Sequence, residues 1–332
     1  MTRLYRVLVL GATCLAFVVV VVGAYVRLMD AGLGCPDWPG CYGAITPNHA
    51  AEDIARAVAS QGGEHGPVSL RKAWKEMFHR YLAGTLGLAI LAIAVLAWRN
   101  RRTHARHLLP CALLALVIVQ AALGMWTVTL LLKPVIVTLH LLGGMATLAL
   151  LSWLTLRELE WPRAFEPAGR GRVRPWAAAG LAIVAVQIAL GGWVSSNYAA
   201  LACVDFPTCH GTWLPNMDFT HGFQVVRELG RTAAGTHLAY EALVAIHWTH
   251  RAGALVTLLY VGTLAWALMR MRGLAPMGVA LAVLLAAQVA LGIANVLAGL
   301  PLAVAVAHNA VAACLLVTLV MINFAVSRKS SS

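Results

Sequence analysis

Long apolar stretches alternate with shorter polar segments along almost the whole chain. Stretches of roughly 20 apolar residues are long enough to cross the hydrocarbon core of a bilayer. The first follows Arg3 and Arg6 but stays apolar to Val26 without a small-residue cleavage site, which predicts a retained membrane helix rather than a removed signal peptide. The pattern therefore predicts an all-α integral membrane protein with eight transmembrane helices, at residues 7–29, 79–98, 108–131, 135–156, 176–196, 244–268, 275–297 and 302–325.

The distribution of charge predicts how these helices are oriented. Hydrophobic residues make up 60% of the chain and charged residues 11%, whereas soluble domains are about half apolar and about a quarter charged. In a soluble protein a net charge of +12 would suggest a nucleic-acid partner. Eight spans place both termini on one side, and that side holds 15 of the 25 Lys and Arg residues but only three of the 13 acids. This excess predicts cytoplasmic termini in a bacterial-type cytoplasmic (inner) membrane, contact with membrane lipid and no nucleic-acid partner.

The two halves of the chain carry matching motifs in the same order. Most matches are offset by 168 residues, and one is offset by 171, which predicts an internal duplication with a slightly longer second outer loop. The matched pairs are Cys35-Pro-Asp-Trp-Pro-Gly-Cys41 with Cys203-Val-Asp-Phe-Pro-Thr-Cys209, His79-Arg80 with His250-Arg251, Gln120-Ala-Ala-Leu-Gly124 with Gln288-Val-Ala-Leu-Gly292, and His140 with His308.

Four helices per repeat give both halves the same orientation in the membrane. We therefore expect two parallel-repeat four-helix bundles, residues 1–156 and 176–332, related by a pseudo-twofold axis along the membrane normal. Residues 157–175 would form a cytoplasmic linker between them. A third Gln-x-x-Leu-Gly pattern at Gln187–Gly191 is interpreted as helix packing through glycine only.

Four histidines distinguish the even-numbered spans. His79, His140, His250 and His308 lie near the outer ends of these spans, where ionisable residues in lipid are costly and usually functional. Simple hydrogen bonds between helices are the alternative. Each half has two such histidines, expected on neighbouring antiparallel helices, without the further Cys or carboxylate ligands of a zinc site or the Glu-x-x-His pairs of a di-iron site. Axial ligation of heme iron is the best match.

Arginines near the histidines are candidates for binding heme propionates. Arg80 and Arg251 directly follow proposed ligands, and Arg27 lies at the outer end of the first span. Guanidinium groups bind carboxylates through paired hydrogen bonds. The alternative for each arginine is a side chain that extends to the membrane interface.

A carboxylate accompanies the histidines of only one half. Glu76 lies one turn before His79, whereas His247 takes the corresponding place before His250. The difference suggests that the first half reacts and the second half holds a cofactor. Alternatively, Glu76 is an interfacial acid that pairs with a neighbouring base, for which the sequence offers Lys72, Lys75 and Arg80.

The cysteines divide between the outer loops and the spans. Cys35 with Cys41, and Cys203 with Cys209, are expected to form disulfides because the compartment outside the membrane permits them. They would staple the two loops, or Cys35 and Cys41 would form a redox-active dithiol beside Glu76. Cys14, Cys111 and Cys314 lie within spans and are expected to be small buried side chains.

Together these motifs resemble the heme A synthase family over residues 5–325. The motifs are Gly34-Cys-Pro-Asp-Trp-Pro-Gly-Cys41, Glu76-Met-Phe-His-Arg80, His140-Leu-Leu-Gly-Gly144, His247-Trp-Thr-His-Arg251 and His308-Asn. The resemblance implies an oxidoreductase of cytochrome oxidase biogenesis that oxidises the C8 methyl group of heme O to a formyl group, giving heme A. It also implies heme O synthase as a partner, and a homo-oligomer is possible.

The resemblance assigns roles to the candidate residues. His79 and His140 would receive the substrate heme O, and His250 and His308 would bind a heme b cofactor. Glu76 matches the family's catalytic acidic position, and Cys35 with Cys41 matches its first-loop cysteine pair, whereas Cys203 with Cys209 is not universal. No Rossmann or flavin motif is present, so heme would carry the redox step, while Glu76 handles protons or stabilises a developing carbocation.

Two other functions use some of the same features. A diheme b-type electron-transfer protein would need the paired histidines but no carboxylate in one half. A transporter built from parallel repeats would bind no heme and would normally show broken helices at the midplane.

Overall fold

The computed structural model describes residues 3–63, 66–101, 107–161 and 170–327. Within these residues the chain is helical, and eight helices are long and apolar enough to cross a membrane, which confirms the eight predicted spans. The long helices are α1 (Arg3–Leu28), α3 (Leu70–Arg99), α4 (Leu108–Thr129), α5 (Pro134–Glu158), α6 (Arg170–Ser196), α8 (Tyr240–Met269), α9 (Ala275–Leu297) and α10 (Leu302–Ser327). Two short helices, α2 (Ala51–Ser60) and α7 (Phe219–Gly222), lie in the connecting loops.

Two long helices begin earlier than their apolar stretches. α3 begins at Leu70, where the Ser69 hydroxyl accepts a hydrogen bond from the Lys72 backbone N–H and caps the helix. α6 begins at Arg170, inside the expected linker, with Pro175 close to its start, where the carbonyl left without a partner can still reach water. The middle of that linker, residues 162–169, lies outside the described residues.

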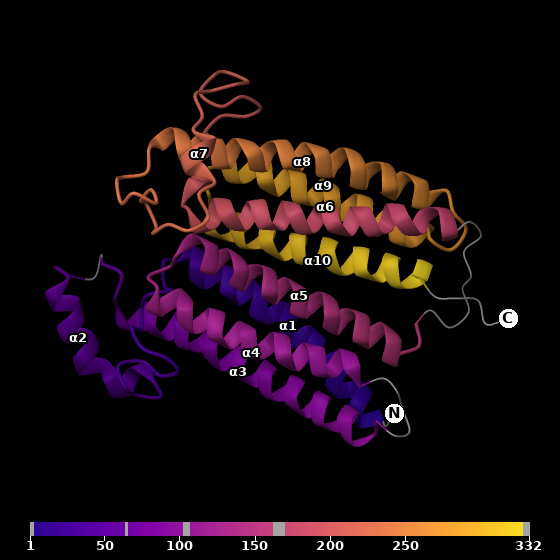
Figure 1. Cartoon of the computed structure of the whole chain (residues 1–332), viewed down its shortest axis with the longest axis horizontal. Coiled ribbons are helices and arrows are strands. Elements are labelled where there is room, and N and C mark those ends of the chain that lie inside the picture. The colour runs from indigo at the N-terminus through magenta and orange to yellow at the C-terminus, as the bar shows by residue number, and fades with distance from the viewer. Residues whose placement is uncertain (1–2, 64–65, 102–106, 162–169, 328–332) are drawn as a thin grey trace.

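The first four long helices pack around one another, and so do the last four (Figure 1). α1 and α4 each contact both α3 and α5, so α3 and α5 lie across the group from each other. In the same way α8 and α10 lie across from each other, each between α6 and α9. The expectation that the histidine-bearing helices are antiparallel neighbours was wrong: they are diagonal and run in the same direction, because each is separated from its counterpart by one intervening helix.

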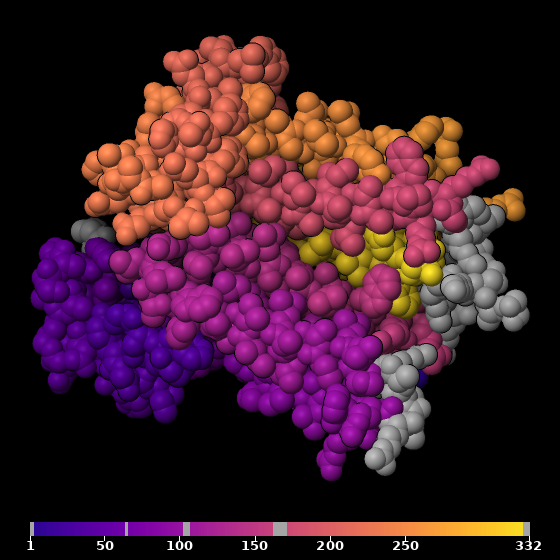
Figure 2. Space-filling view, viewed as in Figure 1, coloured from indigo at the N-terminus to yellow at the C-terminus, as the bar shows by residue number. Residues whose placement is uncertain are grey.

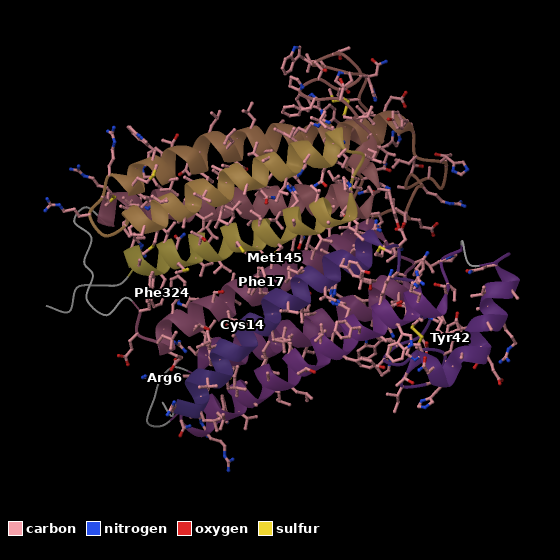
Figure 3. All side chains as sticks on the ribbon, turned by 180° about the vertical axis from the view of Figure 1, so that it is seen from behind. Arg6, Cys14, Phe17, Tyr42, Met145 and Phe324 are labelled. Carbon is pink, nitrogen blue, oxygen red and sulfur yellow. A yellow bond between two sulfur atoms is a disulfide. The ribbon has the colours of Figure 1, made fainter. Side chains whose placement is uncertain are left out.

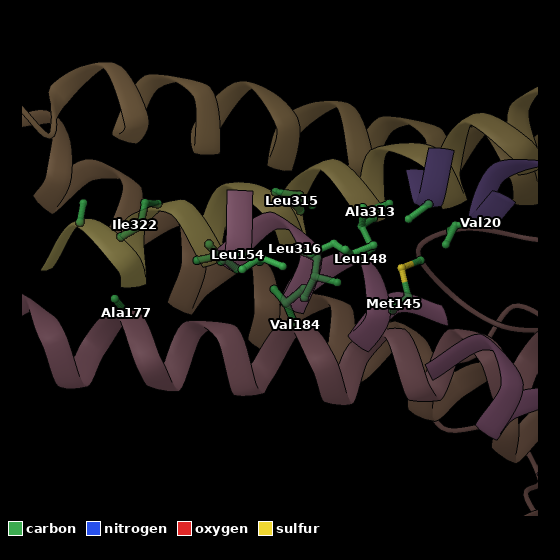
Figure 4. Packing of buried hydrophobic residues seen from close by; sticks show 14 of the residues in the cluster. Val20, Met145, Leu148, Leu154, Ala177, Val184, Ala313, Leu315, Leu316 and Ile322 are labelled. Atoms are coloured by element: carbon green, nitrogen blue, oxygen red, sulfur yellow. The ribbon is translucent and has the colours of Figure 1, made fainter. Parts of the chain in front are cut away.

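One continuous apolar core joins the two groups of helices. α1, α5, α6 and α10 meet in the middle of the molecule. Figure 4 shows Leu148 and Leu154 from the first group close to Val184 and Leu316 from the second. Tight apolar packing of this kind fixes how the two groups sit relative to each other.

The two long loops lie together at one end of the helices, which we call the loop end (residues 30–69 and 197–239). The loops cover this end in the space-filling view (Figure 2), whereas α1 begins and α10 finishes at the opposite end (Figure 1). Figure 3 places Tyr42 at the loop end beside a disulfide and Arg6 at the far end. α2 packs Ile54 under the first loop, at 2% exposure.

Candidate functional site

Each of the four candidate histidines packs its imidazole against a glycine of an adjacent helix. A Cβ atom added to that glycine would lie between 2.9 and 3.3 Å from the Cε1 atom of the ring, so any larger residue would require the imidazole to shift. Four equivalent contacts follow the duplication. The pairs are Gly23 of α1 with His79 of α3, Gly124 of α4 with His140 of α5, Gly191 of α6 with His250 of α8, and Gly292 of α9 with His308 of α10.

The two histidines of each half lie near one another. His79 and His140 lie close enough to interact electrostatically, and so do His250 and His308. His140 and His308 are each six residues into their helices, whereas His79 and His250 are nine and ten residues in. All four therefore lie about two to three helical turns from the loop end. The greater depth of His79 and His250 follows from the early starts of α3 and α8.

A glutamine one turn before the glycine accompanies three of the four histidines. Gln120 Nε2 donates to the backbone carbonyl of His140 at 2.9 Å, and Gln288 Nε2 lies 3.2 Å from a ring nitrogen of His308. Gln187 Nε2 lies 3.1 Å from the ring Nδ1 of His250 and donates to its carbonyl at 3.0 Å. The interpretation of Gln187–Gly191 as glycine packing only was therefore wrong. Its spacing, identical to that of the other two copies, was the signal that pointed to a histidine contact.

Glu76 lies beneath the first-loop disulfide and ties that loop to α3. It is 5% exposed, and its two carboxylate oxygens have separate partners. One accepts a hydrogen bond from Arg80 Nη2 at 2.5 Å, and the other accepts from the backbone N–H of Cys35 at 2.9 Å. Of the bases that the sequence offered as partners, Arg80 forms the ion pair, while Lys72 donates to the Gly66 carbonyl.

Arg80 also holds the first loop. Its guanidinium donates to the backbone carbonyls of Cys35, Asp37 and Gly40 as well as to Glu76. The loop therefore closes over α3 through a carboxylate that accepts from the loop backbone and a guanidinium that donates to it.

The second half reproduces this arrangement with an imidazole in place of the carboxylate. The Cys203 backbone N–H lies 3.3 Å from His247 Nδ1, and Arg251 Nε lies 3.2 Å from His247 Nε2. A neutral imidazole can accept at only one of its nitrogens, so it cannot replace both hydrogen bonds of Glu76. Arg251 donates to the Cys203 and Thr208 carbonyls, and within the described residues no carboxylate lies at ion-pair distance from it. The second half thus has an arginine without an ion-pair partner among these residues, with Asp205 near enough to interact with it electrostatically, where the first half has a closed ion pair.

Arg27 joins the ends of α1 and α6. Its guanidinium donates to the Ser195 carbonyl at 2.6 Å and to Asp30 at 3.3 Å, and it stacks on the Tyr198 ring at 4.0 Å. Tyr198 in turn donates from its hydroxyl to Asp30. Asp30 and Tyr198, like Arg27 and Ser195, are 168 residues apart, so duplicated positions contact one another here.

Both expected disulfides are present. Cys35 is bonded to Cys41 and Cys203 to Cys209, and all four cysteines are buried. Each loop is also closed by an aspartate: Asp37 accepts from the Tyr42 and Gly43 N–H groups, and Asp205 from those of His210 and Gly211. Of the cysteines within spans, Cys14 is exposed and the other two are half-buried, so the expectation that all three are buried was wrong.

The paired imidazoles fit heme iron, whose porphyrin needs only two axial ligands from the protein. His79, His140 and His308 each keep a buried ring Nδ1 without a hydrogen-bond partner, and polar groups of this kind require a partner in apolar surroundings. Within the described residues, no group of three or more His, Cys, Asp or Glu side chains is arranged to hold a metal ion.

Comparison with known proteins identifies the family. The family model described as "Cytochrome oxidase assembly protein" matches residues 6–320. The heme A synthase of Shewanella oneidensis is 43% identical over 95% of this chain and 94% of its own length. The chain belongs to the heme A synthase family. More distant members include the heme A synthases of Rhizorhabdus wittichii, 30% identical over 92% of this chain and 89% of theirs, and Halalkalibacterium halodurans, 29% identical over 95% and 94%.

Proposed function

We propose that this protein is a heme A synthase, an oxidoreductase that converts the C8 methyl group of heme O into the formyl group of heme A for cytochrome oxidase assembly. Family membership supports this activity directly. The observation that carries it structurally is a duplicated pair of neighbouring histidines with a carboxylate beside only one pair. A symmetric electron-transfer protein has no need of that difference.

The two halves are proposed to be equivalent four-helix units, residues 1–156 and 176–332, related by a pseudo-twofold axis along the membrane normal and joined by 157–175. The repeated glycine–histidine contacts support this arrangement. So does the contact between duplicated positions at Arg27 and Ser195, because residues that contact their own counterparts must lie near the axis that relates them.

The first half is proposed to bind the substrate and the second half the cofactor. His79 and His140 would ligate the iron of heme O, and His250 and His308 that of heme b. Arg251 has no ion-pair partner within the described residues, which suits a heme b propionate. Arg27 and Arg80 remain propionate candidates. To bind a propionate, each would give up hydrogen bonds that it now donates to backbone carbonyls. Heme b, when bound, supplies a redox centre for the electrons removed from the methyl group.

Glu76 is proposed to act on protons near the substrate. Its carboxylate is buried, fixed on two sides, and one turn from a substrate ligand. A fixed carboxylate of this kind can accept a proton lost from the methyl group or stabilise positive charge that develops there. Cys35 and Cys41 contribute by holding the backbone N–H that orients Glu76, and a redox role for the pair is the alternative.

The membrane location determines which partners can deliver the substrate. We propose a multi-pass protein of a bacterial cytoplasmic membrane with both termini in the cytoplasm, which places the heme sites toward the outer face. Heme O is insoluble in water, so heme O synthase is the expected donor, and a homo-oligomer is compatible with this arrangement.

Mass analysis of hemes extracted from cells that express this chain together with heme O synthase tests the activity. A formyl heme identical in mass to heme A is expected, and heme b alone would indicate the diheme electron-transfer alternative instead. The Glu76→Gln variant should load both hemes but make little heme A, while the exposed Glu228→Gln serves as the matched control. A normal rate of heme A formation by Glu76→Gln would exclude the proposed role of Glu76.

A further inference from the structure

The two disulfide hairpins, residues 35–45 and 203–213, expose large apolar side chains at matching positions. Trp38 and Phe206, which are 168 residues apart, are 43% and 45% exposed. Ile45 and Trp213, at the same separation, are 78% and 69% exposed. Apolar side chains that are exposed at the same places in both halves indicate a surface that contacts something apolar.

The hairpins contain few groups that would oppose contact with lipid. Each is closed by a pair of backbone hydrogen bonds across its turn, so these polar groups already have partners. Neither hairpin contains Lys or Arg. Each has one formally charged side chain, Asp37 or Asp205, and its carboxylate accepts hydrogen bonds from N–H groups of the same hairpin.

Aromatic side chains of two spanning helices hold the hairpins at the outward surface of the molecule. The Tyr81 hydroxyl of α3 donates to the Ile45 carbonyl at 2.5 Å, and the Trp248 indole of α8 donates to the Trp213 carbonyl at 2.9 Å. Tyr81 and Trp248 each begin a row of outward side chains at helical spacing. The rows are Tyr81, Leu88, Val95 and Trp98 on α3, and Trp248, Leu255, Leu259 and Trp266 on α8. Outward apolar rows on spanning helices face lipid, so the hairpins continue the lipid-facing surface.

The aromatic residues at the two ends of these rows indicate the depth of the hairpins. Tyr81 and Trp98 are 17 residues apart and Trp248 and Trp266 are 18 apart. At 1.5 Å per residue these separations are about 26 Å and about 27 Å, close to the thickness of the hydrocarbon core, about 30 Å. Trp and Tyr concentrate at both boundaries of that core. Tyr81 and Trp248 therefore lie at the boundary on the loop-end side, and the hairpin carbonyls that they bind lie at the same level.

The second hairpin also lies beside the helices rather than over their ends. Figure 1 shows the salmon-coloured part of the second loop, between α6 and α7, projecting sideways past α8. The same part stands clear of the helices in the space-filling view (Figure 2). A segment that projects sideways at the depth of the boundary extends over the surrounding bilayer.

We propose that both disulfide hairpins insert into the leaflet on the loop-end side, at the boundary between phospholipid head groups and acyl chains. The inserted side chains are Trp38, Ile45, Phe206 and Trp213. The hairpin whose Cys35 N–H orients Glu76 is then held by the bilayer as well as by α3. This contact goes beyond the proposed function and does not depend on heme A formation.

Depth-dependent quenching tests the insertion. Ile45→Cys and Trp213→Cys are made separately in a chain that also carries Cys14→Ala, Cys111→Ala and Cys314→Ala, so each has one free thiol. The thiol is labelled with a fluorescent maleimide, and the full chain is placed in phosphatidylcholine nanodiscs with one chain per disc. Phosphatidylcholine with a nitroxide near the head-group end of its acyl chain should remove most of the fluorescence at both positions. Iodide in the water should remove little.

Ala234→Cys in the same background is the matched control. Ala234 is exposed in the polar turn bridged by Arg231 and His237, within the same loop as Trp213. Its label should be quenched by iodide and hardly by the nitroxide lipid. Labels at positions 45 and 213 that respond as the label at 234 does would overturn the proposal.

Two further arms keep the outcome decisive. Leu214→Cys, at the next exposed apolar residue, repeats the measurement if Trp213→Cys lowers the yield of folded protein. Nanodiscs that hold two chains test a second copy as the covering surface. Shielding from iodide that appears only with two chains per disc would assign the hairpins to self-association and overturn insertion into lipid.

Discussion

At the scale of single residues, the absence of a side chain determines where each imidazole lies. Gly191 and its equivalents stand where a Cβ atom would press against a histidine ring. At the duplicated positions Glu76 and His247, by contrast, the side chain that is present determines the contacts. The carboxylate accepts hydrogen bonds at both oxygens, whereas a neutral imidazole accepts at only one nitrogen.

Gly191→Ala should weaken heme b binding. The new Cβ would lie 3.1 Å from the His250 Cε1 atom and push the ring from its position. A forced shift of this kind costs about 1–3 kcal/mol, which corresponds to a loss of heme affinity of about 5- to 150-fold. Heme b content per purified protein measures the effect, and Gly11→Ala, with open space around it, is the control. Equal heme content in both variants would contradict the contact.

At the scale of elements, short closed loops at the loop end position the reactive groups of the helices. The disulfide and an internal aspartate close each loop, and the loop backbone then donates an N–H group to Glu76 or His247. The helices alone would give these side chains only the arginine one turn further along the same helix, Arg80 for Glu76 and Arg251 for His247.

Asp205→Asn should destabilise the second loop in a pH-dependent manner. Hydrogen bonds from Thr208 and from the His210 and Gly211 N–H groups hold the pKa of the Asp205 carboxyl well below its usual range. A depressed pKa contributes stability above the unfolded value of about 4, and this contribution is lost as the pH falls toward the folded value. Melting temperatures of wild type and variant should differ at pH 7 and converge in acid. A difference that persists in acid would contradict the ionic origin.

Removal of either disulfide distinguishes a structural staple from a redox dithiol. As a staple, Cys35→Ser/Cys41→Ser and Cys203→Ser/Cys209→Ser should each lower stability, by about 2 kcal/mol for short loops. Thermal unfolding and heme A yield are measured for both variants. If the first variant loses heme A formation but keeps its stability and heme content, the redox role of Cys35 and Cys41 is correct instead.

At the scale of the whole molecule, the contact between the two groups of helices sets the relative positions of the two candidate heme sites. The apolar core runs through α1, α5, α6 and α10, and Arg27 closes its loop end against Ser195 and Tyr198.

Arg27→Gln should therefore lower the melting temperature while both hemes stay bound. The guanidinium is engaged by protein acceptors and by the Tyr198 ring, so its loss removes a partly buried contact between the groups. Heme content and thermal unfolding are measured on the same preparation. Loss of heme with an unchanged melting temperature would show that Arg27 binds a propionate instead.

The sequence alone determined the membrane helices, the duplication and the candidate ligands. The spans follow from the lengths of the apolar stretches, because a helix that crosses the lipid needs about 20 apolar residues. The repeat follows from motifs that recur at one spacing, such as His140 and His308. The four histidines stood out because ionisable residues in lipid are rare.

Only the tertiary structure decided which side chains meet. Linear spacing does not say that α3 and α5 are diagonal, that Glu76 pairs with Arg80 rather than Lys72, or that Gln187 contacts His250. These contacts join residues far apart in the chain, and they depend on how helices rotate against one another when their apolar faces pack. A pattern along one helix cannot specify that rotation, because it is set by the shapes of all the neighbouring helices together.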